Sequence, residues 1–150
     1  MNYKKLSNFQ SFVQGNFHKK GLKVDDITQA IDCSKSYLHE ILTYRFNYST
    51  MQYVEYYRIL KAVELLLKGE KKFYPKLGFS SSASYCRSFY KIFDICSGEF
   101  LEKAAGADVK IIIDFTSVED PKEKLEEIKK LLNIKKQKAD LKAKKFYKTS

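Results

Sequence analysis

The stretch MQYVEYYRILKAVELLLK, residues 51–68, decides how the rest of the chain can be arranged. Its apolar residues recur at steps of three and four, which is the spacing of one face of an α-helix. They are Tyr53, Tyr56, Leu60, Val63 and Leu67, with Ile59, Ala62 and Leu66 beside them. The remaining narrow face is charged and carries Glu55, Arg58, Lys61, Glu64 and Lys68. A helix apolar over so much of its circumference is expected to lie between two small bodies, although a core helix of any bundle would show a related pattern.

The residues before this helix predict a helix, a short turn and a second helix. Asp25 and Asp26 suit the first turn of a helix over 24–31, and Ser34 can cap the next helix. A further helix is predicted over 3–17. The residues expected to face the core are Leu6, Phe9, Phe12, Val13 and Phe17, then Val24, Ile27 and Ile31, then Tyr37, Leu38, Ile41 and Leu42.

The residues after the long helix predict a second body of similar design. The segment GFSSSASYCRSFYKIF, residues 78–93, begins with small residues and continues with aromatics four apart, at Tyr85, Phe89 and Phe93. The short segment before it contains Pro75. Because proline is disfavoured in a helix interior, this segment does not fit a regular helix. A short helix is expected from Ser97 to about residue 105.

The C-terminal part differs from the rest of the chain, because it begins with a pattern typical of a strand rather than a helix. VKIIIDF, residues 109–115, is a β-branched run that predicts one strand. Asp120 and Pro121, with Glu123 following, form a strong helix start. That helix would present Leu125, Ile128 and Leu132 on its apolar face. The lysine-rich residues 135–148 predict frayed helix or disorder.

Charge and composition narrow the function classes. Lys and Arg number 28 against 18 for Asp and Glu, a net charge of +10, which favours nucleic acid as partner, or secondly an anionic membrane surface. A lysine-rich proteome would give the same balance. No apolar run approaches the roughly 20 residues of a membrane span and no signal core follows the first residues, so a cytosolic protein is expected.

Metal sites and enzyme motifs are not expected in this sequence. Cys33, Cys86 and Cys96 fit neither a disulfide framework nor a zinc pattern, and His18 and His39 have no companion ligands. There is no phosphate-binding glycine loop, no Ser-His-Asp or Cys-His set and no useful carboxylate cluster. We therefore expect no metal, no cofactor and no catalytic activity.

Taken together, the order of elements resembles the DNA-binding domain of the AraC/XylS family of bacterial transcription regulators. The resemblance spans about residues 21–103 and is carried by SKSYLHEIL, YVEYYRILKAVELLL and GFSSSASYCRSFYKIFDICSGEFL. The family's glycine–phenylalanine turn and the aromatic, arginine and phenylalanine after it match Gly78, Phe79, Tyr85, Arg87 and Phe89, and its tyrosine, arginine and alanine of the linker helix match Tyr53, Arg58 and Ala62. Asn47 and Asp94 replace glycines after the recognition helices, a mild change because both tolerate the left-handed conformation.

The resemblance implies a mainly α fold with two helix-turn-helix subdomains joined by a long linker helix, and the residue patterns outside it add a strand-helix extension. Residues 1–20 would add a helix on the first subdomain, 21–105 would form the DNA-binding domain, and 106–150 would form the extension and basic tail. Two recognition helices on one chain would enter successive major-groove segments, about 34 Å apart.

The resemblance also implies the residues that contact DNA. Those facing the bases would be Lys35, Ser36, His39 and Glu40 in the first recognition helix and Ser81, Ser82, Ala83, Cys86 and Arg87 in the second. Arg87 could read guanine or contact a phosphate. Phosphate contacts are expected from Tyr44, Arg45, Lys71, Lys72 and Lys91, although each of these could equally be an ordinary surface residue.

The expected partners follow from this interpretation. Double-stranded DNA comes first, with RNA polymerase as a further candidate, and the protein would act in the bacterial cytoplasm at the nucleoid. A sensory domain commonly precedes this domain in the family, whereas about twenty residues precede it here, so no small-molecule effector is expected. Residues 107–134 would pair with a second copy to form a homodimer, or else pack within the same chain. The alternative function is a degenerate adaptor that binds the transcription machinery or another regulator.

Overall fold

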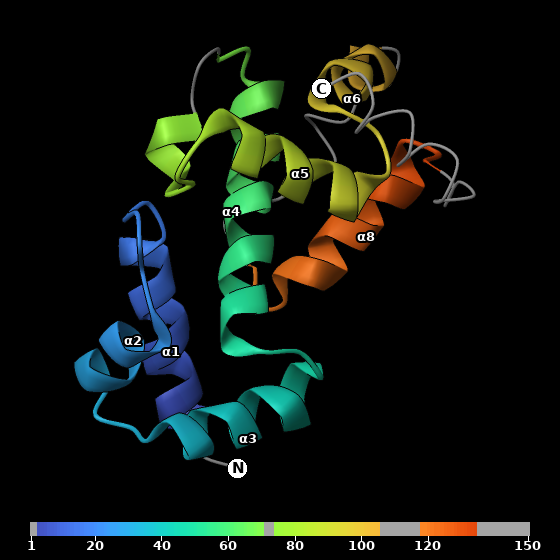
Figure 1. Ribbon diagram of the computed structural model, residues 1–150. Coiled ribbons are helices and arrows are strands. Elements are labelled where there is room, and N and C mark those ends of the chain that lie inside the picture. Colours follow the sequence, from blue (N-terminus) through green and yellow to red (C-terminus); the bar gives the residue numbers. More distant parts are fainter. Residues whose placement is uncertain (1–2, 71–73, 106–117, 135–150) are drawn as a thin grey trace.

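The computed structural model describes residues 3–70, 74–105 and 118–134, and within them the chain is mainly helical with no strand (Figure 1). The elements in chain order are α1 (Tyr3–Asn16), α2 (Val24–Ala30), α3 (Lys35–Phe46), α4 (Thr50–Leu67), the 3-10 helix η1 (Tyr74–Leu77), α5 (Ser82–Phe93), α6 (Ser97–Ala105) and α8 (Pro121–Leu131). The mainly α class expected from the sequence is therefore confirmed. The predicted strand at 109–115 and the tail at 135–148 lie outside the described residues.

The first half of α4 belongs to an N-terminal apolar cluster. Helices α1, α2 and α3 surround it, and the Phe9 and Tyr53 rings meet edge to face with centroids 4.8 Å apart. Ser34 caps α3, because its side chain accepts a hydrogen bond from the Tyr37 amide at 3.1 Å. We call this half of the molecule, residues 3–57, the N-terminal body.

The second half of α4 belongs to a C-terminal cluster with η1, α5, α6 and α8. Its centre is aromatic: Phe89 stacks on Phe93 at 4.8 Å, and Phe100 meets both rings edge to face. We call this half, residues 59–134 as far as they are described, the C-terminal body. The apolar width of α4 is thus used as the sequence indicates, with one cluster around each half.

Helix α8 packs against its own chain. Leu125, Ile128 and Leu132 are 1%, 0% and 6% exposed and lie in the C-terminal cluster. Asp120 caps the helix, since its carboxylate accepts from the amides of Lys122 and Glu123. The homodimer expected through 107–134 stays a prediction, but the apolar face of α8 is already occupied within the same chain.

One core assignment was wrong. Tyr37 was expected to face the core and is instead 38% exposed. Leu38, Ile41 and Leu42 fill the buried stripe of α3, and Tyr37 falls at its edge, one residue before the stripe begins. The outer face of α3 therefore carries an aromatic ring that the sequence pattern had placed inside.

Two structural features are absent from the described part of the chain. None of its helices combines the length and the apolar character needed to cross a membrane. Within the same residues, no group of three or more His, Cys, Asp or Glu side chains is arranged to hold a metal ion.

Candidate nucleic-acid interface

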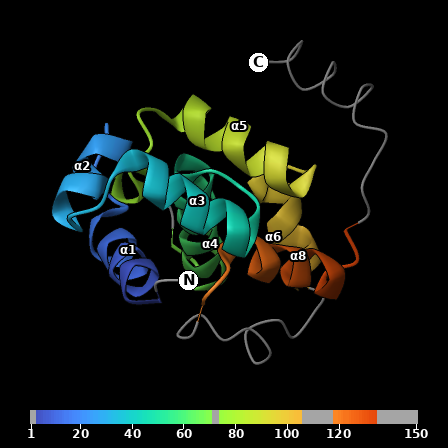
Figure 2. The ribbon, with the colours of Figure 1, turned by 90° about the horizontal axis from the view of Figure 1, so that it is seen from below.

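The two helices that the sequence marks for base contact, α3 and α5, present exposed outer faces. Every base-facing position expected from the sequence is exposed: Lys35, Ser36, His39, Glu40, Ser81, Ser82, Ala83, Cys86 and Arg87. Figure 1 shows α3 at the start of α4 and α5 crossing α4 further along, and Figures 1 and 2 show the two helices running in the same general direction. The two sets of side chains are therefore separated along α4 rather than merged into one patch.

Helix α5 separates its two faces sharply. Tyr85, Phe89 and Phe93 are buried, whereas the outer face is small at its start and carries Arg87 in the second turn. Ser81 caps the helix by accepting from the Ser84 amide at 3.1 Å. Partial burial raises the pKa of the Cys86 thiol, and the nearby Cys96 adds to the shift, so Cys86 is neutral at pH 7. Such a face allows a close approach of the backbone to a large partner.

Helix α3 has a more varied outer face. Lys35 forms an ion pair with Asp25 of α2, with 2.7 Å between Nζ and Oδ1. His39 and Glu40 lie exposed in the middle of the helix. The rings of Tyr37 and Tyr44 are 38% and 80% exposed. The face can therefore offer hydrogen bonds, one cation and two aromatic rings.

The residues expected to contact phosphates differ in their exposure and in whether a carboxylate already pairs with them. Tyr44 is the most exposed large hydrophobic side chain described. Arg45 forms an ion pair with Glu119, and Lys91 forms one with Glu55 at 2.9 Å, a hydrogen bond that raises the pKa of Lys91. Lys71 and Lys72 lie outside the described residues. An approaching phosphate would have to compete with carboxylates for Arg45 and Lys91.

Arg58 of α4 connects the two bodies on one side. Its Nε donates to the Phe17 carbonyl at 2.9 Å, its Nη2 donates to the Lys19 carbonyl at 3.1 Å, and the guanidinium lies 5.8 Å from the Phe79 ring centroid. Gly78, at φ 89°, sits against the same group. A Cβ at Gly78 would lie 2.3 Å from the Phe17 oxygen and 2.9 Å from Arg58 Nε. Only a glycine fits this contact.

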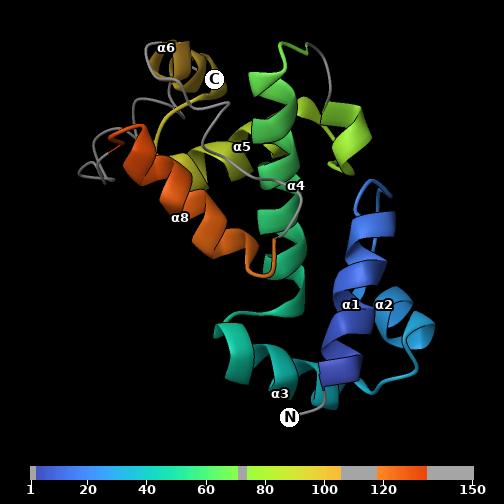
Figure 3. The ribbon, with the colours of Figure 1, turned by 180° about the vertical axis from the view of Figure 1, so that it is seen from behind.

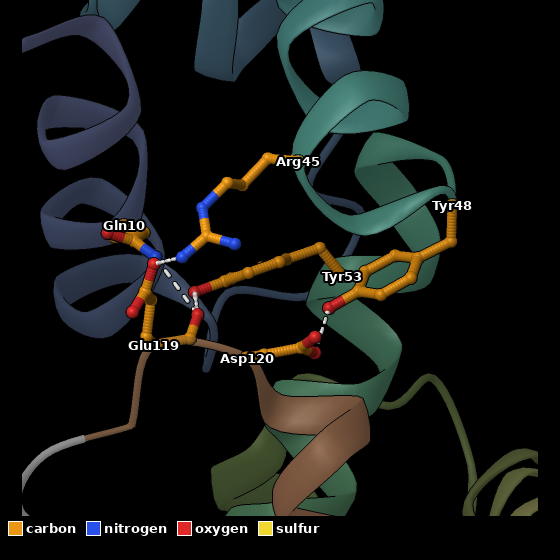
Figure 4. Close-up of polar contacts among 6 residues, drawn as sticks. All are labelled: Gln10, Arg45, Tyr48, Tyr53, Glu119 and Asp120. Atoms are coloured by element: carbon orange, nitrogen blue, oxygen red, sulfur yellow. Dashed lines mark hydrogen bonds and ion pairs between the residues drawn. The ribbon is translucent and has the colours of Figure 1, made fainter. Parts of the chain in front are cut away.

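The segment before α8 connects the two bodies on the other side (Figure 4). The Tyr48 hydroxyl donates to Asp120 Oδ1 at 2.7 Å. The Glu119 carbonyl accepts from Gln10 Nε2 at 2.9 Å and from the Tyr53 hydroxyl at 3.3 Å. Burial and the bond to Asp120 raise the pKa of Tyr48, and burial raises that of Tyr53. Both hydroxyls are therefore protonated donors at neutral pH.

Sequence reasoning missed the acidic partners and the role of this segment. Glu55 was recognised only as part of the charged face of α4, yet it accepts hydrogen bonds from Ser88 at 2.8 Å and from Lys91 on α5. Asp120 was recognised only as a helix start, and Glu119 was not singled out at all. A helix start that carries two adjacent acids, in a chain of net charge +10, was the available signal.

Comparisons of the chain with protein-family models, with curated proteins and with solved structures gave no match.

Proposed function

We propose that the protein is a sequence-specific DNA-binding transcription regulator in which α2–α3 and η1–α5 are two helix-turn-helix units joined by α4. This is the reading that the resemblance to the AraC/XylS family implies. The observation that carries it is that α3 lies at the start of α4 and α5 crosses α4 further along, with their predicted base-facing residues exposed.

The side chains of the two helices suit different kinds of contact with DNA. The small start of α5 permits a deep approach to the groove, and Arg87 can donate two hydrogen bonds to one guanine. Ser36, His39 and Glu40 on α3 can donate to or accept from base edges. In this proposal the protein acts on DNA in the bacterial cytoplasm without a metal, a cofactor or a small-molecule effector.

The proposal is tested by selecting binding sites from random DNA with the purified chain, followed by mobility shifts on the selected and on unrelated DNA. Arg87→Ala should weaken binding to the selected site by about 5- to 100-fold, the range expected for one bidentate base contact, and weaken binding to unrelated DNA much less. Lys103→Ala, an exposed lysine at the end of α6, is the matched control. Equal losses on both DNAs would assign Arg87 to phosphate contact. Failure to enrich any sequence would reject the proposal.

A second candidate is an adaptor that binds a protein of the transcription machinery. The ion pairs of Arg45 with Glu119 and of Lys91 with Glu55 favour it, because they neutralise two of the expected phosphate contacts. The exposed rings of Tyr37 and Tyr44 also favour it, since tyrosine is enriched in protein interfaces. Weak, sequence-independent DNA binding together with stoichiometric binding to purified RNA polymerase would support this alternative.

A further inference from the structure

We infer that the start of α8 is a brace that fixes the orientation of α3 relative to α5, so that Tyr48 and Gln10 are positioning residues for DNA recognition. The inference rests on the proposed function and deepens it. It concerns a segment to which the resemblance assigns no role, since the resemblance ends near residue 103.

The brace has one end in each body. Its first end consists of Glu119 and Asp120, which receive hydrogen bonds from Gln10 of α1, from Tyr48 and from Tyr53 of α4. Its second end is the apolar face of α8, buried in the C-terminal cluster. There Lys129 also lies 3.7 Å from Asp94, the residue that ends α5. A single rigid element thus runs from the residues around α3 to the C-terminus of α5.

The position of the brace lets it restrain bending and twisting of α4. Figures 1 and 3 show α8 on one side of α4 and η1 on the other, and η1 leads to Gly78 and its contact with Arg58. A lone helix between two bodies can bend or twist, and either motion would change the offset between α3 and α5. With one link on each side of α4, such a motion must break hydrogen bonds on at least one side.

The two ends differ in strength, which makes the brace testable by point variants. The second end is mainly an apolar contact, whose loss would unfold the C-terminal body. The first end depends on a few hydrogen bonds, and Tyr48 is only 7% exposed. Tyr48→Phe keeps the buried ring and removes only the hydroxyl, while Asp120 retains its bonds to the first amides of α8. Gln10→Ala removes one donor to the Glu119 carbonyl.

The experiment measures how strictly the protein demands the spacing between the two segments of its selected site. Affinities are compared on the selected site, on the same site with one base pair inserted between the segments, and on a site that keeps only one segment. For the unaltered chain, the insertion should weaken binding strongly. In the double variant Tyr48→Phe/Gln10→Ala, the penalty of the insertion should shrink by about five- to tenfold, the effect expected of two modest hydrogen bonds, and affinity for the single segment should not change.

A merely structural effect would give a different pattern. Loss of folded protein lowers affinity for all three DNAs equally, and urea unfolding of each variant reports that fraction directly. Gln14→Ala, an exposed position one turn further along α1, serves as the matched control and should keep the full spacing penalty. If the double variant also keeps that penalty, the brace is rejected while DNA recognition stands. If the unaltered chain tolerates the insertion, the brace is likewise rejected, and if it selects no site, both proposals fall.

Discussion

At the scale of single residues, the arrangement of the two bodies depends on contacts in which no other amino acid would fit. Gly78 is the clearest case, because its backbone is left-handed and a Cβ at this position would collide with both Phe17 and Arg58. Arg58 in turn has its guanidinium committed to two carbonyls of the N-terminal body. In the proposed function, specific recognition by α3 and α5 would therefore rely on residues that do not themselves touch DNA.

Gly78→Ala should destabilise the protein by about 3 kcal/mol or more, since it adds backbone strain and a steric clash. Gly69→Ala is the matched control: its φ is also positive, at 82°, but a Cβ there would have no atom within 4 Å. That variant should cost about 1–2 kcal/mol. Urea unfolding measures both, and equal losses would show that the contact with Phe17 and Arg58 is not restrictive.

Glu119→Gln should raise affinity for DNA, because it frees Arg45 to bind a phosphate. The ion pair is exposed, so its loss should change stability by less than about 1 kcal/mol. The log–log slope of affinity against salt, near −5 for about six phosphate contacts, should steepen by about one. Glu127→Gln removes an acid of similar exposure that pairs with Lys124 on α8, and it should leave the slope unchanged. Equal behaviour of the two variants would exclude a role for Arg45.

At the scale of elements, the residues that hold α3 in the fold differ from those that the proposed function assigns to recognition. In α3, Ser34 caps the first turn, whereas Ser36, two residues on, is exposed on the expected base-facing side. The inward stripe of Leu38, Ile41 and Leu42 is likewise separate from the outer face. This separation allows fold and function to be tested independently.

Ser34→Ala should lower the free energy of unfolding by about 1 kcal/mol, the usual effect of losing a helix cap. Ser36→Ala should leave stability within about 0.5 kcal/mol but weaken binding to the selected DNA. Thermal unfolding and mobility shifts on the same two variants check this. The reverse assignment of effects would mean that Ser36 supports the fold.

The helices and their caps could largely be predicted from the sequence, because local signals determine them. Ser34 and Asp120 are each the cap that their neighbours indicate, and Asn47 and Asp94 adopt the expected left-handed conformation. What could not be predicted was long-range pairing. Nothing near Arg45 or Tyr48 in sequence indicates Glu119 and Asp120, more than 70 residues away, and Tyr37 lies at the edge of a stripe where periodicity does not decide burial.

At the scale of the whole molecule, buried tyrosines make stability depend on alkaline pH. Burial raises the pKa values of Tyr48, Tyr53, Tyr57 and Tyr85 in the folded protein. Above about pH 10 the unfolded chain loses these protons while the folded chain keeps them. The unfolded state then binds fewer protons, so the free energy of unfolding must fall as pH rises.

Tyr48→Phe should make this decline shallower, by up to about 1.4 kcal/mol per pH unit for one titrating group. The measurement is urea unfolding at several pH values between 9 and 11, with the unaltered chain alongside. Below pH 9 the pH dependence of the two proteins should be parallel. Parallel curves above pH 10 as well would show that the Tyr48 hydroxyl ionises equally in both states.

Both apolar clusters include part of α4. This sharing limits the ways in which the sequence can evolve. Neither apolar cluster closes without its half of this helix, so the chain offers no detachable module that recombination could exchange. In the proposed function, diversification would instead be open at the nine exposed positions expected to face DNA bases, none of which contributes to the buried core. New target preferences would then accumulate one substitution at a time on an architecture that remains fixed.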